Sequence, residues 1–134
     1  MTITATPATD LHRVYVEAIN SNDTDRILEL MSEDIVFQVP GEPELVGKEA
    51  LAAWANGFFA AFEASWDKTE RALEQSGDLA ISRYTYAARF RSHEDGSEST
   101  EIGKGTCIYR REPTGKWVML IDSWSTHEVP AEEH

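Results

Sequence analysis

The sequence predicts an α+β domain in which helices pack on one face of a curved antiparallel sheet. In the first half of the chain, apolar residues recur at helical spacing, with one short strand between the helices. From residue 79 onward, runs rich in β-branched and aromatic residues alternate with turn residues, which is typical of successive strands. The 134 residues suffice for one domain with a core, and no linker or repeat divides them.

Three helices are expected in the N-terminal half, over about residues 10–20, 23–31 and 47–63. The first is marked by one buried stripe: Leu11, Val14, Tyr15, Ala18 and Ile19. The third carries an aromatic stripe, which suits either a core or the wall of a ligand cavity: Leu51, Trp54, Ala55, Phe58 and Phe62. A short strand at Ile35–Val39 separates the second helix from the third, and Ser32–Asp34 is read as a break before it.

The C-terminal half is expected to form antiparallel strands over Leu79–Arg91, Glu98–Arg111 and Trp117–Ser125. Glu112–Gly115 joins the last two, because its proline and glycine suit a hairpin turn. The segment Trp66–Ser76 is ambiguous, since its lysine, arginine, glutamate and leucine residues favour a helix locally.

The last strand is apolar on both faces, which places it in the middle of the sheet with cover on each side. One face carries a single carboxylate, Asp122, between Leu120 and Trp124. The other face carries three apolar residues: Trp117, Met119 and Ile121. A second copy of the same surface is the simplest cover for them, so we expect a homodimer through this sheet face.

Composition restricts the partners. The net charge of −12 opposes contact with nucleic acid and with anionic membrane surfaces, and its simplest role is solubility. No apolar run approaches the roughly 20 residues of a membrane helix. The N-terminal residues lack the features of a secretory signal, and the lone Cys107 favours a reducing compartment, so a cytoplasmic protein is expected.

Asp122 and Tyr15 are the candidate acid/base residues, and each has two interpretations. Asp122 is either a desolvated carboxylate suited to general acid/base catalysis or a structural acceptor that ties the sheet to a helix. We expect it to be buried within hydrogen-bond reach of a donor, with Tyr15 the best candidate. A single donor and an open cavity favour catalysis, whereas several donors favour a structural anchor.

The sequence contains no motif that indicates metal, nucleophilic or nucleotide-dependent chemistry. The four histidines lack the spacing of a metal site, and no nucleophile elbow, phosphate-binding loop or dinucleotide fingerprint is present. Cys107 reads as a small buried residue at least as well as a reactive thiol. We therefore expect no metal and no cofactor.

Six short sequence features follow one another over nearly the whole chain: YVEAINSND at 15–23, EDIVFQVP at 33–40, Gly47 and its helix, GDLA at 77–80, GKW at 115–117 and DSWS at 122–125. Together they resemble the nuclear transport factor 2-like superfamily, of the ketosteroid isomerase and SnoaL-like polyketide cyclase kind. The resemblance implies a cone-shaped domain, a bent sheet wrapped by three helices with a pocket at its open end. It also implies that Trp66–Ser76 is a strand.

The resemblance assigns roles to single positions. Tyr15 matches the isomerase's oxyanion tyrosine, and Trp124 matches a pocket tryptophan. The proton-shuttling aspartate falls at Val39, which cannot accept a proton, and the protonated acid falls at or beside Cys107. Steroid isomerisation by that mechanism is therefore not expected. Asp122 occupies a pocket-facing place that is apolar in the isomerase.

The expected pocket is lined by aromatic residues, with Asp122 and Tyr15 as its polar pair. The remaining predicted ligand contacts are Phe37, Trp54, Phe58, Tyr84, Tyr86, Cys107, Tyr109 and Trp124. One hypothesis is an enzyme (isomerase, dehydratase, cyclase or hydrolase) acting by acid/base chemistry on a small apolar carbonyl compound or epoxide. The alternative is a non-catalytic ligand-binding or dimerisation module. A second polar group within reach of the reacting atom distinguishes them.

Overall fold

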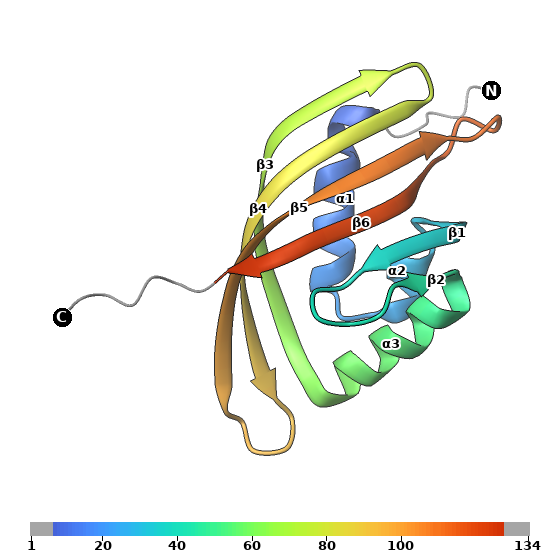
Figure 1. The fold of residues 1–134 in the computed structure, drawn as a ribbon. Helices are drawn as coiled ribbons and strands as arrows, with labels where there is room; N and C mark the ends of the chain where they lie inside the picture. The colour runs from blue at the N-terminus through green and yellow to red at the C-terminus, as the bar shows by residue number, and fades with distance from the viewer. Residues whose placement is uncertain (1–6, 128–134) are drawn as a thin grey trace.

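The protein is described by a computed structural model that covers residues 7–127. Its helices are α1 (Leu11–Asn20), which follows a single 3₁₀ turn at Ala8–Asp10, α2 (Thr24–Leu28) and α3 (Lys48–Ala61). Its strands are β1 (Met31–Gln38), β2 (Leu45–Val46), β3 (Phe62–Ser76), β4 (Leu79–Ser92), β5 (Glu98–Arg111) and β6 (Trp117–His127) (Figure 1).

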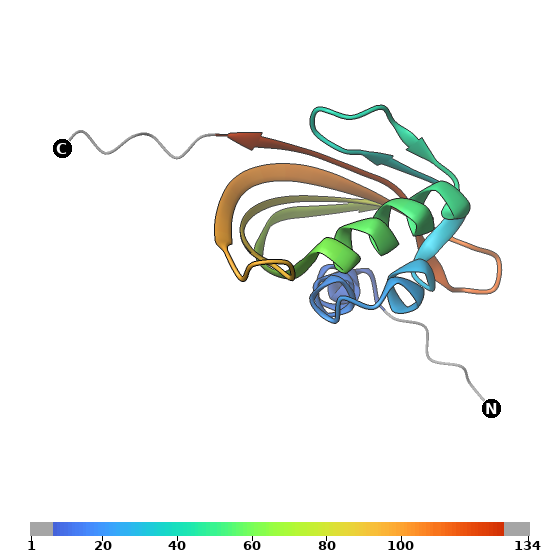
Figure 2. The same ribbon diagram turned by 90° about the horizontal axis from the view of Figure 1, so that it is seen from below.

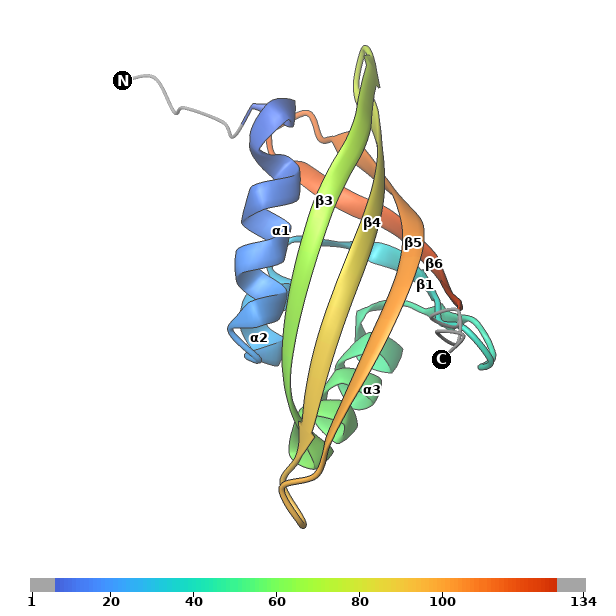
Figure 3. The same ribbon diagram turned by 90° about the vertical axis from the view of Figure 1, so that its left-hand side faces the viewer.

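One curved sheet contains all six strands, in the order β2-β1-β6-β5-β4-β3. Neighbouring strands are antiparallel except β1 and β6, which run parallel. The helices lie on the concave side of the sheet, as Figures 2 and 3 show. The predicted α+β class, with helices covering one face of a bent sheet, is confirmed. The parallel β1–β6 pair was not foreseen.

Element boundaries differ from the sequence prediction at two places. The second helix ends at Leu28 and β1 begins at Met31, so the segment read as a break belongs to a strand. The third helix ends at Ala61, because Phe62 adopts extended backbone angles (φ −138°, ψ 144°) and starts β3. The ambiguous segment Trp66–Ser76 is strand, as the resemblance implied. Pairing with β4, interrupted only by a bulge at Arg71, overrides its local helix propensity.

A bulge in β6 changes the faces of this strand. Ile108 pairs with Ile121 and Tyr109 with Met119, so Leu120 is an extra residue without a partner on β5. Trp117 and Met119 therefore lie in the chain's own core, 7% and 0% exposed. The prediction that they share an outward face with Ile121 is wrong, because the bulge shifts the alternation of side chains by one.

Ile121 itself belongs to an apolar row on the outer, convex face of the sheet. The row crosses five strands, since each of its members pairs with the next: Val46, Val36, Ile121, Ile108 and Ile81. Its two ends are the most exposed, with Val46 at 60% and Ile81 at 47%. This outer-face row is distinct from the core, which lies on the concave side beneath the helices.

Two asparagines bind the edge strand β3. The Asn20 carboxamide accepts a hydrogen bond from the Trp66 amide (2.7 Å) and donates one to the Trp66 carbonyl (3.0 Å). Asn22 makes the same pair of bonds with Ala64, at 2.8 Å and 2.9 Å. The side chains thus take the place of a neighbouring strand and satisfy backbone groups that an edge leaves free.

Replacing Asn20 with alanine removes one of these bonded pairs. We expect Asn20→Ala to lower the free energy of unfolding by about 1–2 kcal/mol, although alanine favours the helix. Urea unfolding measures the change. Asn56→Ala is the control, because Asn56 is exposed on α3. Equal stability of the two variants would contradict the role given to Asn20.

Candidate functional site

The polar centre of the concave side is Asp122, which is 1% exposed. The Tyr15 hydroxyl, from α1, donates to Asp122 Oδ2 at 2.7 Å. The Tyr84 hydroxyl, from β4, donates to Asp122 Oδ1 at 2.8 Å. A carboxylate removed from water needs such donors, and each of its oxygens has one. Tyr15 is the partner expected from the sequence, whereas Tyr84 was expected only as a ligand contact.

Tyr84 reaches Asp122 by lying across β5. It pairs with Gly105 on that strand, where a Cβ would lie 2.5 Å from Tyr84 Cζ and 2.8 Å from the Ser123 carbonyl oxygen. Tyr86 occupies the corresponding space over Gly103, where a Cβ would lie 2.6 Å from its ring. A side chain at either position would displace a tyrosine ring, so β5 requires glycine at both.

Lys68 is the second charged group at the site. It lies on β3 with its ammonium 4.8 Å from the centroid of the Tyr15 ring and 4.2 Å from that of Tyr84. Both distances suit a cation–π interaction. This lysine was not predicted from the sequence, because the inward side of β3 is defined only once Trp66–Ser76 is known to be a strand.

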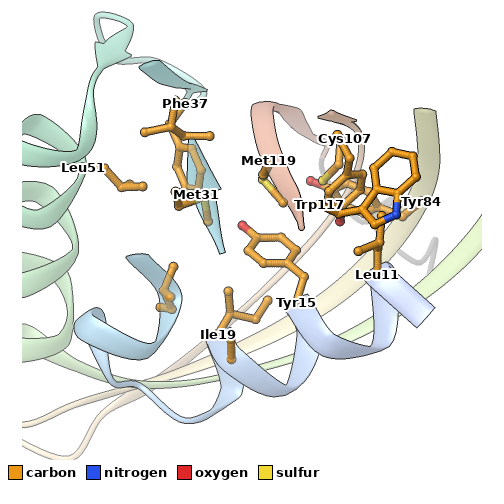
Figure 4. Close-up of a cluster of buried hydrophobic side chains, with 14 of the residues drawn as sticks. Leu11, Tyr15, Ile19, Met31, Phe37, Leu51, Tyr84, Cys107, Trp117 and Met119 are labelled. Atoms are coloured by element: carbon orange, nitrogen blue, oxygen red, sulfur yellow. The ribbon is translucent and has the colours of Figure 1, made fainter. Parts of the chain in front are cut away.

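A cavity of about 50 Å³ lies beside Asp122, with room for a few water-sized groups. Its walls include both proposed acid/base residues and six of the eight predicted ligand contacts: Asp122, Tyr15, Phe37, Trp54, Phe58, Tyr84, Tyr86 and Trp124. Cys107 and Tyr109 are buried but do not line it. Two further walls, Leu51 and Ala55, belong to the third-helix stripe that suited a cavity wall. The remaining walls were not predicted: Ile19, Ile27, Phe59, Trp66 and Lys68. Figure 4 shows Tyr15 and Ile19 projecting from α1 into the buried cluster.

A wider cleft of about 260 Å³ adjoins this cavity and shares four aromatic walls with it: Trp54, Phe58, Trp66 and Trp124. Trp54 and Phe58 stack with ring centroids 5.5 Å apart. Two carboxylates, Glu42 and Glu101, also line the cleft. The inner cavity and the outer cleft therefore share these aromatic walls. We call the two spaces together the aromatic passage, with Asp122 at its inner end and the two glutamates at its outer end.

All four tyrosines of the chain are buried. Burial, and then the charge of Asp122, raise the pKa of Tyr15 and of Tyr84. Burial also raises the pKa of Tyr86, whose hydroxyl donates to Glu101 Oε2 at 2.8 Å, and the pKa of Tyr109. The phenols near Asp122 thus remain protonated donors at neutral pH. Burial likewise raises the pKa of Cys107, which leaves it without thiolate character.

The family model of the SnoaL-like domain matches residues 12–120. The chain belongs to the SnoaL-like domain family. No curated protein matches the sequence.

Solved structures share the SnoaL-like fold at low identity. A ketosteroid isomerase-like protein from Erwinia carotovora atroseptica is 21% identical, with a TM-score of 0.84 over 91% of this chain and 95% of that one. A candidate dehydratase of the nuclear transport factor 2-like family from Streptomyces avermitilis is 19% identical, with a TM-score of 0.77 over 92% and 100%. A candidate scytalone dehydratase from Novosphingobium aromaticivorans is 16% identical, with a TM-score of 0.79 over 90% and 81%. These likenesses establish the fold of this SnoaL-like protein.

The described residues contain neither a metal-binding cluster nor a membrane-spanning helix. Between residues 7 and 127, no group of histidine, cysteine and acidic side chains has the arrangement of a metal site. Over the same residues, no helix combines the length and the apolarity that crossing a membrane requires.

The buried tyrosines predict an alkaline limit to stability. Above about pH 10 the unfolded chain loses phenol protons while the folded chain keeps them, because the folded pKa values are raised. Stability is therefore unaffected below that pH and falls above it, by up to about 1.4 kcal/mol per pH unit for each tyrosine. Tyrosinate absorbance should appear only together with unfolding. Its appearance in folded protein near pH 10 would contradict the burial of these phenols.

Proposed function

We propose that this SnoaL-like protein binds a small, flat, mostly apolar molecule and catalyses proton transfer on it, with Asp122 as the base. The observation that carries the proposal is a buried carboxylate in the wall of an otherwise largely apolar cavity. Desolvated acid/base groups in apolar cavities are characteristic of catalytic sites.

The size of the passage limits the ligand. The inner cavity accepts only a few heavy atoms, whereas the outer cleft, with its tryptophan and phenylalanine walls, accepts a ring. A substrate therefore places its aromatic or alicyclic body in the outer cleft, against the rings of Trp54, Phe58 and Trp124, and directs one small polar group toward Asp122. Together the two spaces approach the lower end of the roughly 300–1,000 Å³ of known ligand pockets.

The chemistry follows from the donors around Asp122. A carbonyl group entering the cavity takes over the Tyr15 hydrogen bond, while Tyr84, fixed over Gly105, keeps its bond to the carboxylate. Asp122 then removes a proton from the carbon next to the carbonyl. The electrons of the broken C–H bond move to the carbonyl oxygen, where the Tyr15 hydroxyl stabilises the enolate by hydrogen bonding. Return of the proton from Asp122 to another carbon completes an isomerisation. In a dehydration, the enolate electrons form a C=C bond to the next carbon, whose hydroxyl takes the proton from Asp122 and leaves as water.

The alternative is a ligand-binding module without turnover. It is favoured by the occupation of both Asp122 oxygens, which is the arrangement expected of a structural anchor. In that case the carboxylate holds α1 and β4 to β6, and the cavity binds its ligand through apolar contact alone.

Hydrogen–deuterium exchange at carbon tests proton transfer without knowledge of the natural substrate. We expect the protein to accelerate deuterium incorporation next to the carbonyl of a small aryl ketone such as α-tetralone in D₂O, followed by NMR. Asp122→Asn should lower this rate by about 10²- to 10⁴-fold, since the amide is not a base. Tyr15→Phe should lower it less.

The control for this experiment is Asp67→Asn, which removes an exposed carboxylate on β3 and should leave the exchange rate unchanged. Thermal unfolding of each variant separates loss of the base from loss of the fold. A folded Asp122→Asn protein with the wild-type rate would overturn the assignment of the base. If the wild-type protein binds aryl ketones but exchanges none of them, the binding module is the correct function.

We also propose that the functional unit is a homodimer formed through the outer-face row, in place of the face expected from the sequence. The proposal keeps Ile121 and replaces Trp117 and Met119, which lie in the core, with Val46 and Ile81. An apolar row across five strands is a surface that a two-fold related copy can cover.

Sedimentation tests the dimer. We expect a dimer at micromolar concentration, and we expect Ile81→Glu to shift it to monomer because it buries a charge in each copy of the apolar contact. Ala87→Glu, on the same face of β4 but outside the row, is exposed and makes the same change of net charge, so it is the control. A wild-type monomer would contradict this proposal while leaving the site unaffected.

A further inference from the structure

We infer that the ligand carries a positive charge, on an amine or quaternary ammonium group that sits in the outer cleft beside Glu101, with its neutral polar group directed inward to Asp122. This inference rests on the proposed function, since it specifies the ligand of the same passage. It is carried by the aromatic walls of the cleft and by the position of its carboxylates.

The cleft combines two features that bind organic cations. Its walls include five aromatic rings, those of Trp54, Phe58, Trp66, Phe90 and Trp124. Aromatic faces attract cations through the ring quadrupole, and surfaces of this kind recognise quaternary ammonium groups. Trp54 is one of the four aromatic residues that line both the cleft and the inner cavity.

The charges of the cleft have one sign. Among the described residues that line it, Glu42 and Glu101 are the charged side chains. Glu42 Oε2 accepts a hydrogen bond from the Trp54 indole at 3.4 Å, which holds this carboxylate beside the aromatic wall. The net charge of −12 adds a long-range attraction for cations.

Glu101 is positioned to receive a ligand donor. It is half-buried on β5, and the Tyr86 hydroxyl binds its Oε2 at 2.8 Å. No hydrogen bond or ion pair of the described part of the chain engages Oε1, so one carboxylate oxygen is free for an ammonium group. Tyr86 also lines the inner cavity and therefore connects the two ends of the passage.

Lys68 sets the orientation of the ligand. Its ammonium group lies over the Tyr15 and Tyr84 rings at the inner end, where it repels a second cation. The positive group of the ligand consequently stays in the cleft, about Glu101, and a hydroxyl or carbonyl group faces Asp122. An anionic ligand has the reverse preference and meets two carboxylates on its way in.

Three probes of nearly the same shape isolate the effect of charge: phenyltrimethylammonium, tert-butylbenzene and benzenesulfonate. Quenching of tryptophan fluorescence reports binding, because three of the four tryptophans line the passage. We expect the cation to bind about 10-fold more tightly than the neutral isostere and the anion to bind most weakly. Added salt should weaken only the binding of the cation.

Two variants test whether the preference for a cation depends on Glu101 in the cleft. Glu101→Gln should weaken phenyltrimethylammonium about fivefold and leave tert-butylbenzene unchanged, since the amide keeps an acceptor for Tyr86 but has no charge. Glu94→Gln makes the same change of net charge in the exposed β4–β5 loop and should alter neither affinity. A loss equal in the two variants would show that only the net charge matters and would overturn the assignment to Glu101.

The two proposals fail in different ways. If tert-butylbenzene or benzenesulfonate binds as tightly as the cation, the inference of a positively charged ligand is wrong, whereas the aromatic passage remains a binding site. If none of the three probes binds, the passage is not a ligand site, and the proposed function fails together with this inference.

Discussion

Burial of the Asp122 carboxylate is the constraint on which the rest of the concave side depends. An ion without water needs donors from the protein, and here they come from elements far apart in the sequence, Tyr15 on α1 and Tyr84 on β4. The requirement fixes the distance between helix and sheet and holds both tyrosine rings under Lys68. Gly105 is part of the same requirement, because a side chain there would exclude the Tyr84 ring. Helix position, strand composition and cavity wall are thus consequences of one buried charge.

The same centre relates stability to the proposed chemistry. Two phenols on one carboxylate form a satisfied network, which favours rigidity. A carbonyl group that replaces Asp122 as the acceptor of the Tyr15 proton keeps this phenol paired and leaves Asp122 Oδ2 free to take a proton from the substrate. The bent sheet and the covering helices bring Asp122, Tyr15 and Tyr84 together. The proposed chemistry is argued from these side chains and not from the fold.

Periodicity was sufficient for the helices and for the later strands, because their apolar stripes reflect burial directly. Periodicity was insufficient where pairing with a distant strand determines the secondary structure or the direction of a side chain. The helix-favouring residues of β3 form a strand because they pair with β4. This pairing also places Lys68 over the tyrosine rings of the site. The bulge at Leu120 reverses the faces of Trp117 and Met119, and nothing in the local pattern marks it. Asp122 was identifiable as one carboxylate in an apolar strand, whereas Gly103 and Gly105 gain meaning only with the tyrosines above them.

Proton NMR of the tyrosine hydroxyls tests the central claim most directly. Hydroxyl protons bonded to a buried carboxylate exchange slowly and resonate far downfield, so two such signals are expected in the folded protein. Tyr15→Phe should remove one, Tyr84→Phe the other, and Asp122→Asn should shift both upfield, while a ligand that enters the cavity should move the Tyr15 signal first. Absence of these signals in folded protein, or signals that Asp122→Asn leaves in place, would contradict a carboxylate held between the two tyrosines.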